Sequence, residues 1–189
     1  MIEYQRDIKQ MTIKLNIGSG KTNFGYEWTN IDKLNLPHIK SHDITKLNYL
    51  DNSINEIYSS NTLEYFDYQK AYEVLKEWYR VLKVGGIIRL SVPNFDKLIG
   101  LYFKTYNMSD IIGPLFGKIE VDGEEIYHKT VFNKVTLMNL LYVVGFKRIK
   151  EYDIETTEPF CSFDDQSHAY YPHMDKNGLL LTLNLEAIK

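Results

Sequence analysis

The chain has 189 residues, 44% of them hydrophobic, and a formal net charge of −3. This composition predicts one folded domain over residues 1–189 and excludes disorder. The small negative net charge does not favour binding to nucleic acid or to an anionic membrane. The single cysteine, the polar opening MIEYQRDIKQ and the lack of a long apolar run lead us to expect a cytoplasmic protein without disulfides or membrane spans.

Four short strands are expected in the first third of the chain, where apolar residues alternate with polar ones. They are Ile13–Ile17, Trp28–Asp32, Lys40–Ile44 and Ile54–Ser60. The first strand runs into the glycines of IGSG, and such a turn brings backbone close to a ligand.

The clearest helix is expected after Asp67, an N-cap residue, because apolar residues then recur at helical spacing. Gly85 and Gly86 are expected to end this helix. The stretch IIRLSVP follows as a strand of the kind buried in a parallel sheet. Strand, glycine turn, strand, helix and strand form the order of βαβ folds.

Residues 94–132 are aromatic and irregular, with one expected helix over Phe95–Tyr106. So long a connection predicts a lid, over about residues 94–127, inserted into a core of residues 12–93 and 128–189. The elements expected after it are a helix over Asn133–Val144, ended by Gly145, a strand over Phe146–Ile154, a polar loop over Glu155–Gly178 and a last strand from Leu179.

The glycine turn departs from two nucleotide-binding patterns. The dinucleotide pattern G-x-G-x-x-G needs a third glycine, and Asn23 stands there instead. Asp32 follows Gly18 by only fourteen residues, whereas the ribose-binding acid of that pattern lies about 20 residues on. No P-loop is present. An NAD(P)-dependent oxidoreductase is therefore kept only as an alternative.

Six stretches in order carry a resemblance: LNIGSG, NID, HDI, IYSSNTLEYF, EWYRVLKVGGIIRLSVP and LLYVVGF. This set resembles class I S-adenosylmethionine-dependent methyltransferases, in the branch similar to small ubiquinone-biosynthesis-type (methyltransferase type 11-like) enzymes. The resemblance covers about residues 12–95 and, more loosely, 128–188. It implies S-adenosyl-L-methionine as cofactor and S-adenosyl-L-homocysteine as product.

The resemblance also implies an α/β fold. Its sheet is Rossmann-like and doubly wound, with about seven strands in the order 3-2-1-4-5-7-6, strand 7 antiparallel, and the lid after strand 5. The family usually has a helix between the glycine turn and the ribose acid. Because eleven residues separate Gly20 from Asp32, we expect that helix to be shortened or absent.

The cofactor-binding residues implied by the resemblance follow the carboxyl ends of strands: Ile17, Gly18, Ser19, Gly20, Asp32, Lys33, Asp43, Ile44, Ser60 and Asn61. A carboxylate suits the ribose, since Asp32 can accept hydrogen bonds from both hydroxyl groups. Asp43 is implied beside the adenine amine and Ile44 on the ring; the alternative for Asp43 is a loop cap. Glu64 is interpreted as an exposed charge at a helix start, with a site role as the alternative.

In the implied topology, the lid and the loop before the last strand lie over the ligand face of the sheet. They offer the candidate substrate residues Tyr106, Tyr127, Asp165, His168 and Tyr170. His128 is the candidate base, because an oxygen nucleophile must lose a proton and histidine suits neutral pH; the alternative is a packing residue. The acidic residues and histidines of the last loop match no metal-ligand spacing, so no metal is expected.

The sequence thus predicts methyl transfer to a small-molecule or glycan-like acceptor, most simply at oxygen. A non-catalytic module that binds S-adenosylmethionine is the second alternative. The identity of the acceptor and the oligomeric state are left open.

Overall fold

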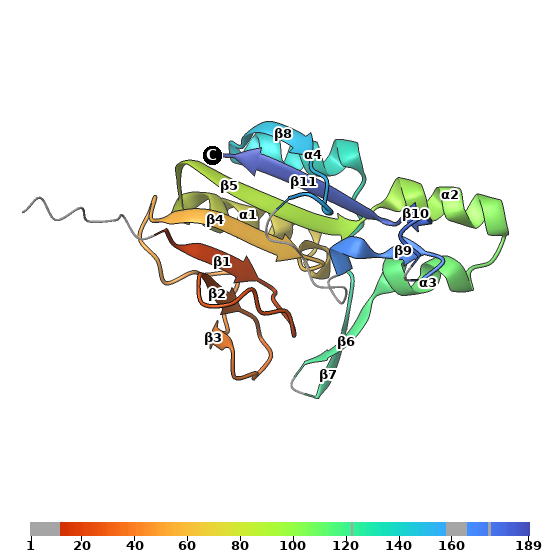
Figure 1. The fold of residues 1–189 in the computed structure, drawn as a ribbon, viewed down its shortest axis with the longest axis horizontal. Coiled ribbons are helices and arrows are strands. Elements are labelled where there is room, and N and C mark those ends of the chain that lie inside the picture. Colours follow the sequence, from red (N-terminus) through yellow and green to blue (C-terminus); the bar gives the residue numbers. More distant parts are fainter. Residues whose placement is uncertain (1–11, 122, 158–165, 174) are drawn as a thin grey trace, which may run out of the picture.

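The computed structural model describes residues 12–121, 123–157, 166–173 and 175–189, and its centre is a seven-stranded sheet (Figure 1). The strand order is β3-β2-β1-β4-β5-β11-β8. β11 is antiparallel to both of its neighbours, which confirms the expected order with an antiparallel last strand. The bounds are β1 Lys14–Ile17, β2 Trp28–Ile31, β3 Ile39–Ser41, β4 Ile54–Ser60, β5 Leu82–Pro93, β8 Lys147–Glu151 and β11 Thr182–Ile188.

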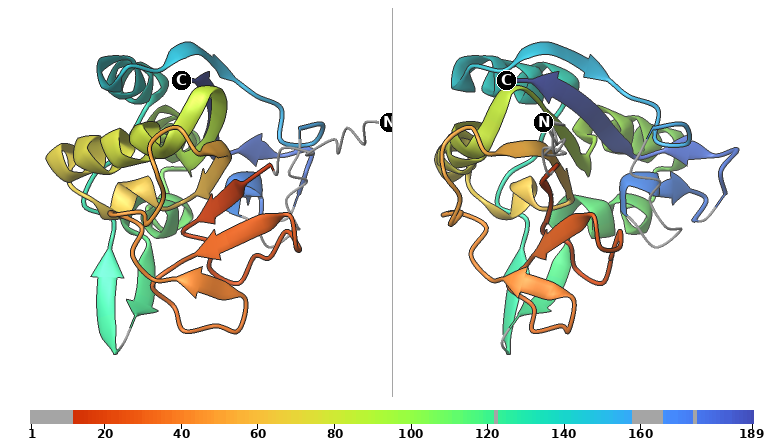
Figure 2. Two further views of the ribbon diagram at one scale, coloured as in Figure 1. Left: turned by 90° about the vertical axis from the view of Figure 1, so that its left-hand side faces the viewer. Right: turned by 60° about the vertical axis from the view of Figure 1, so that its left-hand side comes forward.

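Two helices, α1 (Tyr68–Val81) and α4 (Lys134–Val144), cover one face of this sheet (Figure 2). Asp67 caps α1 as predicted, since its carboxylate accepts a hydrogen bond from the backbone N–H of Lys70. Asn133, predicted as the first residue of α4, is its N-cap, and Gly145 ends the helix as predicted. α1 connects β4 to β5, and α4 connects the segment after β5 to β8, so both connections move toward the β8 edge of the sheet. Right-handed crossovers in the same direction place both helices on the same face.

The opposite face of the sheet is polar. Four ion pairs join adjacent strands across it. Lys14 pairs with Glu56, Glu56 with Arg89, Arg89 with Glu186, and Glu186 with Lys150. The chain of pairs crosses β1, β4, β5, β11 and β8 in spatial order. Beside this charged row, the short 3₁₀-helix η2 (Gln166–His168) packs on the same face, where the Ser167 carbonyl accepts hydrogen bonds from Thr182 and Asn184 of β11.

A loop covers this polar face beside β1 and β2. The β1–β2 connection, residues 18–27, has turns but no helix, which confirms the expectation for the short spacing before Asp32. Phe24 from this loop packs edge-on against Trp28 and Tyr58. A short loop that brings one aromatic ring thus covers sheet surface that a helix would otherwise cover.

The expected end of α1 at Gly85–Gly86 is wrong. The helix ends at Val81, because Leu82 is already extended and pairs with Ile54 of β4. The residues between Leu82 and Ile87 form a bulge in β5, where Gly85 has a φ of +81°. A Cβ on Gly86 would lie 2.9 Å from a backbone oxygen, so this glycine serves close backbone packing within the sheet.

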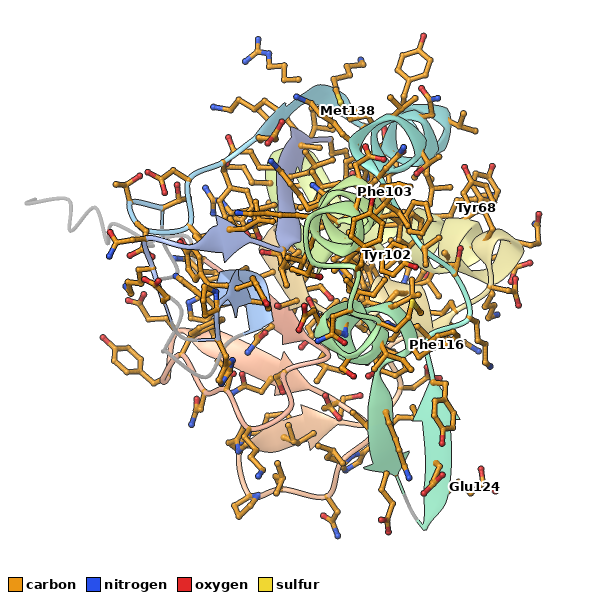
Figure 3. The ribbon with its side chains drawn as sticks, turned by 90° about the vertical axis from the view of Figure 1, so that its right-hand side faces the viewer. Tyr68, Tyr102, Phe103, Phe116, Glu124 and Met138 are labelled. Atoms are coloured by element: carbon orange, nitrogen blue, oxygen red, sulfur yellow. The ribbon has the colours of Figure 1, made fainter. Side chains whose placement is uncertain are left out.

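The segment between β5 and α4 is more regular than the sequence indicated. It holds α2 (Phe95–Thr105), α3 (Ser109–Phe116) and a hairpin of β6 (Lys118–Val121) and β7 (Glu124–Tyr127). Only α2 was predicted. Figure 3 shows Phe116 where α3 meets the hairpin and Glu124 at the hairpin's far end, so the hairpin projects away from the sheet.

The inserted segment packs against the loop that precedes β11. Leu98, Leu101 and Ile111 form a small apolar cluster with Leu181, and the Tyr171 hydroxyl donates to Asp110 over 3.1 Å. That loop contains η2 (Gln166–His168), β9 (Tyr170–Tyr171) and β10 (Leu179–Leu180). The two segments therefore meet, as the topology predicted. Among the described helices, none is long and apolar enough to cross a membrane.

Candidate functional site

The glycine turn after β1 is tied to the end of β2 by hydrogen bonds. Gly18 donates from its backbone N–H to the carbonyl of Ile31 over 2.8 Å. Gly20 donates to Asp32 Oδ2 over 2.8 Å, and Asp32 Oδ1 accepts from the N–H of Leu34 at the same distance. The glycine turn and Asp32, both of which the resemblance implies as cofactor-binding, thus lie in direct contact at the carboxyl edge of the sheet.

Gly18 is required by a close approach to the turn after β4. Its φ is +69°, and a Cβ there would lie 1.8 Å from Thr62 Oγ1. The Thr62 hydroxyl donates to the carbonyl of Ser60 over 3.0 Å. Sequence reasoning missed Thr62, because its role is steric and no local pattern shows which residue will face a glycine.

Two histidines that sequence reasoning also missed contact the backbone of the glycine turn after β1 and of Asp32. His38 places Nε2 3.0 Å from the carbonyl oxygen of Gly20, and His42 places Nδ1 3.0 Å from that of Asp32. Gly20 is therefore held on both sides, by Asp32 at its N–H and by His38 at its carbonyl. Neither histidine stands in a recognisable spacing, so nothing in the sequence singled them out.

A relay of asparagine side chains fixes the loop that replaces the usual helix. Asn16 donates to Asn30 over 3.0 Å, and Asn30 donates to Asn23 Oδ1 over 3.1 Å. The same Asn23 oxygen accepts the N–H of Gly25. Asn23, which breaks the dinucleotide pattern, is thus a structural anchor of the loop.

Several buried polar atoms at this edge have no hydrogen-bond partner. They are Ser19 Oγ, Ser59 Oγ, Ser60 Oγ, Asn61 Oδ1 and Ser91 Oγ, from the ends of β1, β4 and β5. Buried polar atoms are nearly always hydrogen-bonded in folded proteins. The edge therefore has unused capacity for a ligand rich in hydroxyl, amino and carboxylate groups.

Asp43 and Ile44 hold the loop after β3. Asp43 Oδ1 accepts from the backbone and hydroxyl of Thr45, and this hydroxyl bond is the main reason that the pKa of Asp43 is lowered. Ile44 belongs to the main apolar core, and its carbonyl accepts from Trp78 Nε1. Both residues have structural roles here, and their placement beside an adenine stays a prediction.

Glu64 is the largest departure from the sequence interpretation. It lies in η1 (Leu63–Tyr65) after β4, and its side chain is 1% exposed, so the reading as an exposed charge is wrong. Neither carboxyl oxygen has a hydrogen-bond partner, and burial raises its pKa to about 8. The chain returning from the β6–β7 hairpin covers it, with the N–H groups of Lys129 and Thr130 donating to the Glu64 carbonyl.

His128 lies against Glu64. Its Nε2 is 3.7 Å from Glu64 Oε1, its side chain is 5% exposed, and Nδ1 has no partner. A Cβ on Gly117 would meet the His128 ring at 2.1 Å, and Tyr65 packs edge-on against that ring. Burial lowers the pKa of His128, so the imidazole is neutral at pH 7.

Comparison with known proteins shows a partial match to one family model and a shared fold with several solved structures. Residues 17–90 match a family model described as a methyltransferase domain. No curated protein matches the chain. A solved structure of a S-adenosylmethionine-dependent methyltransferase from Archaeoglobus fulgidus is similar, with a TM-score of 0.59 and 18% identity over 94% of this chain and 86% of that one.

Two further solved structures are similar in fold. One is a S-adenosylmethionine-dependent methyltransferase from Methanosarcina mazei, with a TM-score of 0.57 and 19% identity over 94% of this chain and 92% of that one. The other is the 1,6-didemethyltoxoflavin-N1-methyltransferase of Burkholderia thailandensis with bound 1,6-didemethyltoxoflavin and S-adenosylhomocysteine, with a TM-score of 0.53 and 13% identity over 94% of this chain and 70% of that one.

Residues 17–90 thus match a methyltransferase-domain model, and the fold of the chain is that of S-adenosylmethionine-dependent methyltransferases. S-adenosylmethionine is the cofactor expected from the sequence resemblance. The unpartnered polar atoms at the carboxyl edge fit this molecule, which carries ribose hydroxyls, an amino group and a carboxylate.

The candidate substrate residues do not form one cluster. Tyr106 is 76% exposed at the outer end of α2, and Tyr127 is exposed with its hydroxyl bonded to Glu125. His168 and Tyr170 lie together near Glu155, from which His168 Nε2 is 3.7 Å away. Asp165 lies outside the described residues. Metal-binding clusters are absent from the described part of the chain.

Proposed function

We propose that the protein is an S-adenosylmethionine-dependent methyltransferase that methylates an oxygen atom of a small-molecule or glycan-like acceptor, with His128 in the machinery that removes the acceptor's proton. S-adenosylmethionine supplies the methyl group. The observation that carries the proposal is the buried pair of His128 and Glu64, because a neutral imidazole beside a carboxyl group can take a proton near neutral pH.

We also propose which residues hold the cofactor: Ile17, Gly18, Ser19, Gly20, Asp32, Lys33, Asp43, Ile44, Ser60 and Asn61. The contact between Gly20 and Asp32 and the unpartnered atoms of Ser19, Ser60 and Asn61 support this set. Residues 94–127 act as a lid in this proposal, one unit with the core. The packing of α2 and α3 on the loop before β11 supports that arrangement.

Calorimetric titration tests the cofactor half of the proposal. Micromolar binding of S-adenosylmethionine and S-adenosylhomocysteine, without binding of NAD⁺, is the expected result. A preference for NAD⁺ would overturn it in favour of an oxidoreductase.

Turnover tests the catalytic half. S-adenosylhomocysteine release is measured over a panel of hydroxylated acceptors for the wild type and for His128→Ala. The variant is expected to keep its cofactor affinity and to slow turnover by about 100-fold. Cofactor binding without turnover on any acceptor would favour a non-catalytic binding module, and full activity of the variant would remove His128 from the machinery.

A further inference from the structure

A small cavity lies at the carboxyl ends of β4 and β5, and Glu64 and His128 are its titratable residues. Pro93, the last residue of β5, lines it from the sheet, and its other walls come from α2, α3 and residues 130–132. Ligands of open α/β sheets bind outside the carboxyl ends of the strands. The cavity therefore lies at the end of the sheet where the chemistry of this fold takes place.

The carboxyl group of Glu64 has no structural partner that explains its burial. A carboxyl group removed from water is normally paired or hydrogen-bonded, since an isolated buried charge is very unfavourable. Here both oxygens lack a hydrogen bond, and the closest basic group is the His128 ring 3.7 Å away. This distance is longer than a hydrogen bond, so a small closing movement is enough to make one.

Glu64 and His128 come from opposite sides of one junction. Glu64 belongs to the turn after β4, and His128 directly follows β7 of the inserted segment. Backbone bonds hold the two sides together, from the N–H groups of Lys129 and Thr130 to the Glu64 carbonyl, at 2.8 and 3.2 Å. The pair is therefore positioned where the inserted segment meets the catalytic edge.

We propose that Glu64 and His128 act as one proton-sharing unit, in which the ionised Glu64 holds His128 ready to take the proton of a hydroxyl-bearing acceptor. This inference rests on the proposed function and names Glu64 as a positioning residue for it. It restricts the acceptor to molecules with an O–H group that must lose its proton, which a tertiary amine or a thioether lacks.

The proton balance follows from this assignment. Methylating a hydroxyl group forms an O–C bond and breaks the S–C bond of the methyl donor, whose electron pair stays on sulfur. One proton is released. With Glu64 ionised and His128 neutral, the pair takes that proton without leaving an unpaired buried cation. With Glu64 protonated, a proton on His128 would be an isolated charge, so the pair is a poor acceptor.

The groups that face Glu64 define the pH range of this unit. His128 is neutral above pH 7, because burial lowers its pKa, and burial raises the pKa of the adjacent Tyr65 to about 12. The cavity walls from β5, α2, α3 and residues 130–132 carry no titratable side chain. Glu64, with its pKa raised to about 8, is thus the group of this cavity that titrates between pH 7 and 9.

A titration followed by nitrogen NMR tests the shared unit without an acceptor. The five histidines are labelled with ¹⁵N, and His128→Asn assigns the His128 signals. The expected result is an inflection near pH 8 in the ring shifts of His128, lost in Glu64→Gln and kept in Glu73→Gln, an exposed control. His128 shifts that do not change between pH 7 and 9, or the same inflection in Glu64→Gln, would contradict the proposal that Glu64 and His128 share a proton.

The pH dependence of turnover tests the role of the unit in proton removal. With an acceptor that the wild type methylates, kcat/KM is expected to rise to a plateau above pH 8. Glu64→Gln is expected to lose this rise and about 100-fold in rate, with S-adenosylmethionine affinity unchanged. An unchanged pH profile in Glu64→Gln would overturn the role. Loss of cofactor binding by the wild type would instead contradict the proposed function, so the two failures are distinguishable.

Discussion

Asp32 Oδ2 accepts a hydrogen bond from the backbone N–H of Gly20 across 2.8 Å. This bond joins the acid at the end of β2 to the glycine turn after β1, and a second bond joins Asp32 Oδ1 to Leu34. The carboxylate is thus held in place before any ligand arrives. Such preorganisation favours affinity, because little conformational freedom remains to be lost on binding.

Asp32→Ala is expected to weaken S-adenosylmethionine binding by about 1–3 kcal/mol, the range for losing hydrogen bonds to a charged group. The fold should survive, since Asp32 lies at a strand end outside the apolar core. Calorimetric titration beside a melting curve measures both effects, with Glu73→Ala as the surface control. An unchanged dissociation constant would show that Asp32 does not bind the cofactor.

Gly18→Ala is expected to destabilise the fold by at least about 2 kcal/mol, because the new Cβ would overlap Thr62 and the φ of +69° disfavours alanine. Gly20→Ala is the matched control. Its φ is also positive, at +53°, but a Cβ there has open space, so about 1–2 kcal/mol of backbone strain is expected. Equal losses of the free energy of unfolding in urea would rule out the steric contact.

Arg89→Met tests the row of ion pairs on the polar face of the sheet. Arg89 pairs with both Glu56 and Glu186, and all three side chains are 13–17% exposed. Leaving two mostly buried carboxylates without their common partner is expected to cost about 2–4 kcal/mol. Lys70→Met removes an exposed pair with Glu73 and should change the stability by less than about 1 kcal/mol. Similar small effects in both variants would contradict a structural role for the row.

Glu64 is expected to make stability fall as the pH rises. Its pKa is 4.5 when unfolded and about 8 when folded, so the folded state binds more protons between these values. Its favourable contribution is complete below pH 4.5 and is lost as the pH rises to 8, a change of up to about 5 kcal/mol. Urea titrations at pH 5 and 8.5 should show this loss in the wild type and in Glu73→Gln but not in Glu64→Gln. Parallel pH profiles in all three proteins would show that Glu64 ionises normally.

Local signals predicted most of the sheet and its main helices. The N-cap residues Asp67 and Asn133, and the helical spacing after each, are properties of short stretches, so α1 and α4 begin where expected. The contact between Gly20 and Asp32 could also be predicted, because adjacent parallel strands bring their carboxyl ends together.

The sequence by itself therefore determined the helix starts and the glycine turn, since each depends on spacing within one segment, and the strand order was implied by the family that its short stretches resemble. Only the tertiary structure decided that Glu64 is buried, because the covering residues 128–130 lie more than sixty positions away along the chain. The same holds for Thr62 beneath Gly18 and for the ion pairs across β1 to β8. Burial and charge pairing depend on neighbours in space, which become neighbours only when the sheet has formed.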